Sequence, residues 1–129
     1  MSILRNLRDW LWPATSHVRR GQLWLAKVPQ WRHGYDHLDL LHITCVSTDG
    51  GVITSCPPRT GSLPAINSPG PALSLRDLVR THKLIPVEEA EMMGYVVVGE
   101  MADGSQRVQT TTGSIAVIHY DRTNREEGA

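Results

Sequence analysis

The densest group of side chains able to bind a metal lies within ten residues of the sequence. Histidines and aspartates stand among apolar and aromatic residues between His33 and His42. Imidazole and carboxylate groups are common ligands of zinc and iron. No second group of spaced ligands completes a known zinc pattern, so a polar loop with one buried histidine explains the same residues. The alternative is a metal-dependent enzyme with a site made of His33, Asp36, His37 and His42.

Two cysteines, Cys45 and Cys56, are the other candidates for chemistry, because a thiol beside a histidine can act as a nucleophile. His42 and His119 are the histidines that the fold could bring to them. Neither cysteine has an adjacent cation or lies at the start of an expected helix, which are settings that activate thiols. The sequence also has no nucleophile elbow, zinc-protease motif or phosphate-binding loop. It therefore favours a protein without catalytic residues and without a cofactor.

Charge is divided between the two ends of the chain, although the net charge is zero. Residues 1–33 carry six Lys and Arg against one Asp, which is +5, together with all four tryptophans. Residues 86–129 carry three Arg against eight acidic residues, which is −5. Pairing of the two ends within the fold would explain this distribution. Single-stranded nucleic acids, however, bind basic grooves with aromatic stacking platforms. That alternative predicts a nucleic-acid site made of Arg19, Arg20, Lys27, Trp31 and Arg32.

Two segments are suited to contact with a protein partner. Residues 1–13 predict a short docking helix, because apolar residues recur at helical spacing between Ser2 and Pro13. Residues 57–72 hold five prolines and two glycines, which excludes a central strand and predicts a loop. Amphipathic helices and Pro-rich segments are both common docking elements. The residues predicted to contact a partner are Leu7, Trp10, Leu11, Arg59 and Leu63.

The chain of 129 residues is expected to form one domain. Helix caps predict a helix after Ser74, with Lys83 in its last turn, and a second helix from Pro86 to Gly94. Residues 121–129 are polar and are expected to form a frayed tail. β-Favouring runs predict strands over residues 21–28, 38–47, 52–55, 95–100, 106–111 and 115–120.

These elements predict a mainly β (α+β) fold. We expect a small SH3-like barrel or a bent antiparallel sheet with two or three short helices. The tryptophan-bearing front segment and the Thr-rich tail are expected to share that sheet. A hairpin joins the second and third strands, and its register decides whether the thiols meet. A Gly50-Gly51 loop would place Cys45 opposite Cys56, whereas an Asp49-Gly50 loop would place Cys45 opposite Thr54.

The hexapeptide Arg-Arg-Gly-Gln-Leu-Trp at residues 19–24 resembles the start of small phage-encoded or actinobacterial SH3-like β-barrel proteins. This resemblance covers about a third of the chain and implies a fold more than an activity. Residues 94–121 resemble the C-terminal strands of SMI1/KNR4-type immunity proteins. The helical signature found near the N-terminus of that second family is absent here.

Taken together, these features predict a non-enzymatic binding or regulatory module, of phage origin, that acts on a protein partner as an inhibitor or adaptor. The single-strand nucleic-acid binder and the metal-dependent enzyme remain the alternatives. No apolar run approaches the length of a bilayer span, and no secretion signal opens the chain. A cytoplasmic location with reduced thiols is therefore expected.

Overall fold

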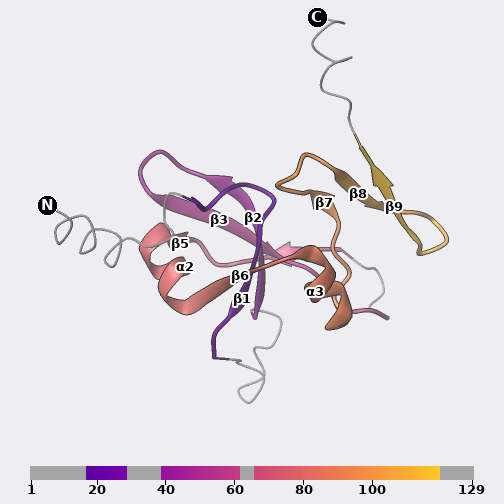
Figure 1. Ribbon diagram of the computed structural model, residues 1–129, viewed down its shortest axis with the longest axis horizontal. Coiled ribbons are helices and arrows are strands. Elements are labelled where there is room, and N and C mark those ends of the chain that lie inside the picture. The colour runs from indigo at the N-terminus through magenta and orange to yellow at the C-terminus, as the bar shows by residue number, and fades with distance from the viewer. Residues whose placement is uncertain (1–16, 29–38, 62–65, 120–129) are drawn as a thin grey trace, which may run out of the picture.

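A computed structural model describes residues 17–28, 39–61 and 66–119 of the chain. The predicted N-terminal helix and the C-terminal tail lie outside these residues. None of the helices within the described residues is long and apolar enough to cross a membrane. The described part is mainly β, as predicted, and consists of two antiparallel sheets and two short helices (Figure 1).

The larger sheet has β1 and β2 at its centre because both strands are apolar on both faces. Its strand order is β4-β3-β2-β1-β6, and β5 pairs with another part of β3. Trp24 of β1 lies opposite Leu41 of β2, and both are buried. The neighbouring pair, Leu25 and Leu40, points to the opposite face. The strands are β1 Leu23–Ala26, β2 Leu40–Val46, β3 Gly51–Cys56, β4 Ser68–Pro69, β5 Leu73–Ser74 and β6 His82–Ile85.

Two hydrophobic clusters cover the two faces of this sheet. One cluster joins Trp24 and Leu41 to Leu78 of a helix packed against the sheet. The other joins Leu23 and Leu40 to residues of the later part of the chain, including Tyr95. Trp24 is 3% exposed, so it is a core residue and not a stacking platform.

The smaller sheet is formed by the end of the chain alone, in the order β7-β8-β9. Figure 1 shows it set apart from the strands of the larger sheet. The prediction that the front segment and the tail share one sheet is therefore wrong, and the described strands close no barrel. The predicted meander itself is confirmed, with β7 Gly99–Glu100, β8 Gln106–Gln109 and β9 Ile115–Ile118.

The β2–β3 hairpin has neither of the two expected registers. Cys45 lies opposite Ile53, because the loop has three residues, 48–50, and the Ser47 N–H donates to the Gly51 carbonyl at 2.8 Å. The register shifts once more between Ile43 and Cys45. A β-bulge of this kind adds one residue to one strand and re-aims the side chains that follow it. Cys45 is exposed and Cys56 is buried, and both thiols are free.

A strand follows the first described helix where the sequence analysis expected more helix. Lys83 belongs to β6 and not to the last helical turn, because the helix ends at Thr81. β6 pairs antiparallel with β1 over all four of its residues, and the apolar Leu84 and Ile85 lie opposite Trp24 and Leu23. Pairing with the central strand therefore overrides the local helical preference of this segment.

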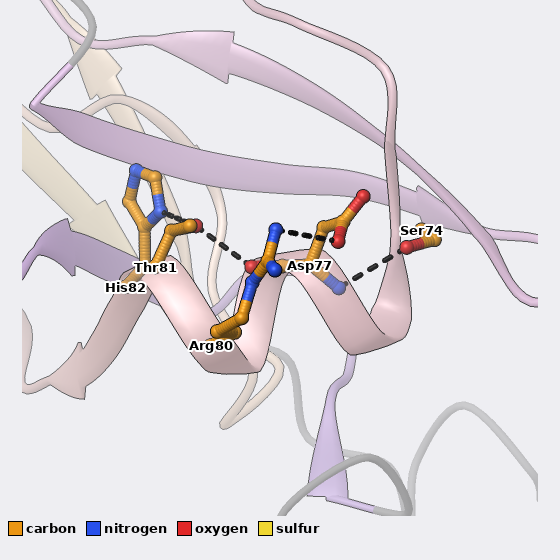
Figure 2. A network of polar contacts seen from close by, with 5 residues as sticks. All are labelled: Ser74, Asp77, Arg80, Thr81 and His82. Atoms are coloured by element: carbon orange, nitrogen blue, oxygen red, sulfur yellow. Dashed lines mark hydrogen bonds and ion pairs between the residues drawn. The ribbon is translucent and has the colours of Figure 1, made fainter.

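Helix α2 (Leu75–Thr81) begins as predicted at Ser74. The Ser74 hydroxyl oxygen accepts a hydrogen bond from the backbone N–H of Asp77 at 3.1 Å (Figure 2). This bond satisfies one of the amide groups left open at the helix start. Arg80 also pairs with Asp77 at 3.1 Å along the same exposed face.

Replacing Ser74 with alanine is expected to lower the free energy of unfolding by about 1 kcal/mol, because the Asp77 amide loses its partner. Urea denaturation of both proteins measures this difference. Ser74→Asp restores an acceptor at the same position and should recover most of the loss. Equal stability of the alanine variant and the parent would contradict the capping role.

Helix α3 (Val87–Met92) is also confirmed, with Pro86 as its N-cap and Gly94 just beyond its end. Gly94 has a φ of +92°, a conformation that glycine adopts without strain. The described residues of the Pro-rich segment contribute the short edge strand β4 to the larger sheet, which agrees with its proline content.

Candidate functional site

The two sheets meet where the turn before β1 packs against the turn between β7 and β8. Gly21 has a φ of +88°, and its N–H donates to the Ile43 carbonyl at 2.8 Å. A Cβ atom at Gly21 would lie 2.4 Å from the backbone nitrogen of Ala102 and 2.4 Å from the carbonyl carbon of Met101. Only glycine therefore allows this close contact between the two turns.

His42 of β2 joins the two sheets from inside the junction. Its side chain is buried, and Nε2 lies 3.3 Å from the Glu100 carbonyl oxygen of β7. Because a carbonyl only accepts, Nε2 carries the proton and Nδ1 is an acceptor. Nδ1 is buried without a hydrogen-bond partner among the described residues. Burial lowers the pKa of His42, although the hydrogen bond to the Glu100 carbonyl opposes this shift. His42 is therefore held in its neutral form.

A cleft of about 520 Å³ opens beside this junction, between the two sheets. Its apolar walls include Ile43, Val98 and Val108. The two arginines that line it are both paired, Arg20 with Glu100 at 2.7 Å and Arg107 with Glu91. Among the described residues, the cleft therefore offers no unpaired arginine for an anionic ligand.

The structure does not gather the described cations of the predicted nucleic-acid site. Arg19 and Arg20 precede β1, whereas Lys27 follows it. A strand of four residues separates these groups by about 13 Å. Arg20 is paired with Glu100, and the Lys27 ammonium donates to the Val79 carbonyl at 3.1 Å. Trp31 and Arg32 lie outside the described residues.

Arg59, predicted to contact a partner, is exposed and also makes contacts within the chain. Its guanidinium lies 4.2 Å from the ring centre of Tyr95 and donates to the Tyr95 hydroxyl and to the Met93 carbonyl. These contacts fix the Pro-rich segment against the residues after α3. The other predicted contact residues, Leu7, Trp10, Leu11 and Leu63, lie outside the described part of the chain.

Of the four residues of the predicted metal site, the structure describes only His42. His33, Asp36 and His37 lie outside the described residues. Within residues 17–28, 39–61 and 66–119, no three His, Cys, Asp or Glu side chains come together to hold a metal ion. The one described ligand candidate, His42, uses Nε2 in the junction between the sheets.

The hydroxyl–imidazole pair at the end of α2 is not a nucleophile and its base. Figure 2 shows Thr81 between Asp77 and His82. The Thr81 hydroxyl donates to the Asp77 carbonyl at 2.7 Å and lies 2.7 Å from His82 Nδ1. Because the hydroxyl has a single proton, Nδ1 must donate to Thr81 and cannot deprotonate it. This pair instead caps the end of the helix.

The thiol of Cys56 is also in a setting that keeps it inert. Cys56 is buried in the larger sheet, and burial raises the pKa of its thiol, although a hydrogen bond with Ser68 opposes that shift. A protonated thiol is a poor nucleophile. Cys56 therefore packs as a small apolar side chain.

The most distinctive surface of the described residues is the outer strand of the smaller sheet. β9 pairs with β8 on one side and with no other described strand. Its large apolar residues Ile115, Val117 and Ile118 are 37%, 43% and 42% exposed. Successive side chains of a strand alternate between its faces, so both faces of β9 present apolar groups.

This surface was not predicted, although its signal is present in the sequence. Residues 108–119 contain no Lys, Arg, Asp or Glu. Edge strands are commonly protected by charged residues, proline or a bulge, and the outer strand β4 carries Pro69. An uncharged, β-branched strand at the end of a meander predicts an unprotected edge.

Comparison with known proteins returned no matching family model, no similar curated protein and no similar solved structure.

Proposed function

We propose that this chain is a non-enzymatic module that binds a protein partner, in the cytoplasm, as an inhibitor or adaptor. The partner contributes an extended apolar segment that adds a strand to the smaller sheet along β9. One observation carries this proposal: β9 is an uncharged edge strand whose three large apolar side chains remain partly exposed.

Strand addition has two sources of binding free energy, and β9 provides both. The outer backbone N–H and C=O groups of an edge strand can pair with the main chain of an incoming segment. Ile115 and Val117 lie on one face, and Ile118 lies on the other, as the pairing with β8 shows. Apolar side chains of the incoming strand would cover these residues on both faces.

The charge of the partner segment follows from the charge of the strand. Because residues 108–119 carry no Lys, Arg, Asp or Glu, a charged side chain opposite β9 would lose water contacts without gaining an ion pair. The segment that fits is therefore uncharged and rich in β-branched or aromatic residues.

Replacing Ile118 with lysine is expected to reduce capture of the partner by at least about tenfold, because a charge is placed among the apolar side chains of the contact. Ile118 lies opposite the uncharged Gln106, so the lysine meets no like charge within the sheet. Affinity capture from a host lysate, followed by mass spectrometry, compares the variant with the parent.

Ile53→Lys is the matched control, because Ile53 is a 56% exposed isoleucine of β3 in the larger sheet. A protein retained by the parent and by Ile53→Lys, but lost with Ile118→Lys, supports binding at β9. The proposal is wrong if every retained protein is retained equally by all three.

A further inference from the structure

The larger sheet has its own free edge at β6, and the charges around this strand differ between its two ends. Within the described residues β6 pairs only with β1, and Leu84 at its centre is 50% exposed. The end at which β6 begins has a groove of about 480 Å³ lined by Lys27, Arg80 and His82. The other end has a groove of about 510 Å³ lined by Glu88 and Asp103.

Ionised groups define the two ends. Arg80 and Glu88 are exposed, and Lys83 is exposed on the strand itself. Hydrogen bonds from the Ser105 hydroxyl and amide lower the pKa of Asp103, which keeps this carboxyl ionised at neutral pH. One end of β6 is therefore basic and the other is acidic.

We propose that two copies of this chain form a symmetric dimer by antiparallel pairing of β6 with β6 of the second copy. A two-fold axis between antiparallel strands brings the start of one strand to the end of the other. The basic end of each copy then meets the acidic end of its partner at two equivalent places. A strand from another protein would also need one basic and one acidic end in this order. A second copy of the chain has them by symmetry.

Symmetry and charge together select the register of the pairing. The two-fold axis leaves each face of the sheet on the same side in both copies. Residues that lie opposite each other share a face, so their numbers must be both odd or both even. Pairing about Lys83 would place two like charges opposite each other, which is unfavourable. Pairing about Leu84 instead joins two exposed leucines and places Lys83 opposite Ile85. Arg80 of α2 and Glu88 of α3 lie just beyond the two ends of β6, so this pairing brings each of them to the oppositely charged end of the second copy.

The test is the mass of the full chain in solution, measured by sedimentation velocity over an about hundredfold dilution series. We expect a species of twice the chain mass of 14.3 kDa that dissociates on dilution. Dissociation should occur at higher protein concentration when salt is added, because exposed ion pairs are screened. A single-chain mass at every concentration would overturn the proposal.

Charge reversal tests the contact between the basic and acidic ends. Arg80→Glu and Glu88→Arg should each raise the dimer dissociation constant by about tenfold, because each change replaces two attractions by two repulsions. The double variant Arg80→Glu/Glu88→Arg restores opposite charges across the axis and should recover dimerisation. A dimer that is unaffected by either single change, or that the double change does not restore, contradicts the proposed pairing.

Leu84→Lys tests the centre of the interface, with Ile53→Lys as its control. Leu84→Lys places a further pair of like charges on the axis and should leave only the single chain, while Ile53→Lys remains a dimer. Circular dichroism of each variant confirms that it is folded. A folded Leu84→Lys protein that still has twice the chain mass would assign the dimer to another surface and overturn the proposal.

Discussion

Replacing Gly21 with alanine is expected to lower the free energy of unfolding by about 2 to 4 kcal/mol, because it forces the two sheets apart. The added methyl carbon would lie 2.4 Å from the Ala102 nitrogen and from the Met101 carbonyl carbon, and 2.7 Å from the Glu100 carbonyl oxygen. These are backbone atoms and cannot rotate away. Urea denaturation of the variant and the parent gives the difference.

Gly113→Ala is a matched control for the backbone conformation. Gly113 has the same φ of +88°, but nothing lies within 4 Å of its added Cβ. This variant should lose only the roughly 1 to 2 kcal/mol that the left-handed conformation costs a residue with a side chain. If both variants lose the same free energy, the contact between the two turns contributes nothing to stability.

Acidification is expected to destabilise the protein through His42. In the unfolded chain a histidine binds a proton near pH 6.5, whereas burial lowers the pKa of His42 in the fold. The unfolded state therefore binds more protons below that pH. Stability that is fully present above about pH 6.5 falls as the pH decreases, by up to about 1.4 kcal/mol per pH unit, until the folded pKa is reached.

His42→Gln should remove most of this slope, because glutamine has no proton to gain. His119, which follows β9 and is exposed, provides the matched substitution: His119→Gln replaces a histidine and leaves the contact of His42 with Glu100 in place. Denaturation curves between about pH 7.5 and pH 5.5 span the change. An unchanged slope in His42→Gln would show that another group causes the acid sensitivity.

Local signals in the sequence predicted individual helices and strands better than they predicted how the strands pair into sheets. Ser74 and Gly94 mark helix ends through their own hydrogen bonding and backbone conformation, so short-range chemistry is sufficient to place them. β6 was missed because its strand conformation depends on pairing with β1, a partner about 60 residues away in the sequence. The register of the β2–β3 hairpin was missed because its loop has three residues, 48–50, where two were expected, and because a bulge at Thr44 shifts the pairing again.

The candidate site was predicted less well, for the same reason. Arg20 and His42 were assigned to two different functions, yet both contact Glu100 in the junction between the sheets. The contact of the Arg59 guanidinium with Tyr95 was not predicted either; that Arg59 contacts a partner stays a prediction. The sequence shows which side chains carry a charged or hydrogen-bonding group. The fold determines which of these groups have a partner within the chain.

The central claim is that β9 is the surface that receives the partner. Amide hydrogen exchange, followed residue by residue with and without the captured partner, tests it most directly. Protection of Ile115 and Val117 should rise by at least about tenfold on binding, because their amides point away from β8 and gain hydrogen-bond acceptors, whereas those of Ala116 and Ile118 face β8. Unchanged exchange in β9, with protection gained on another element, would contradict the account.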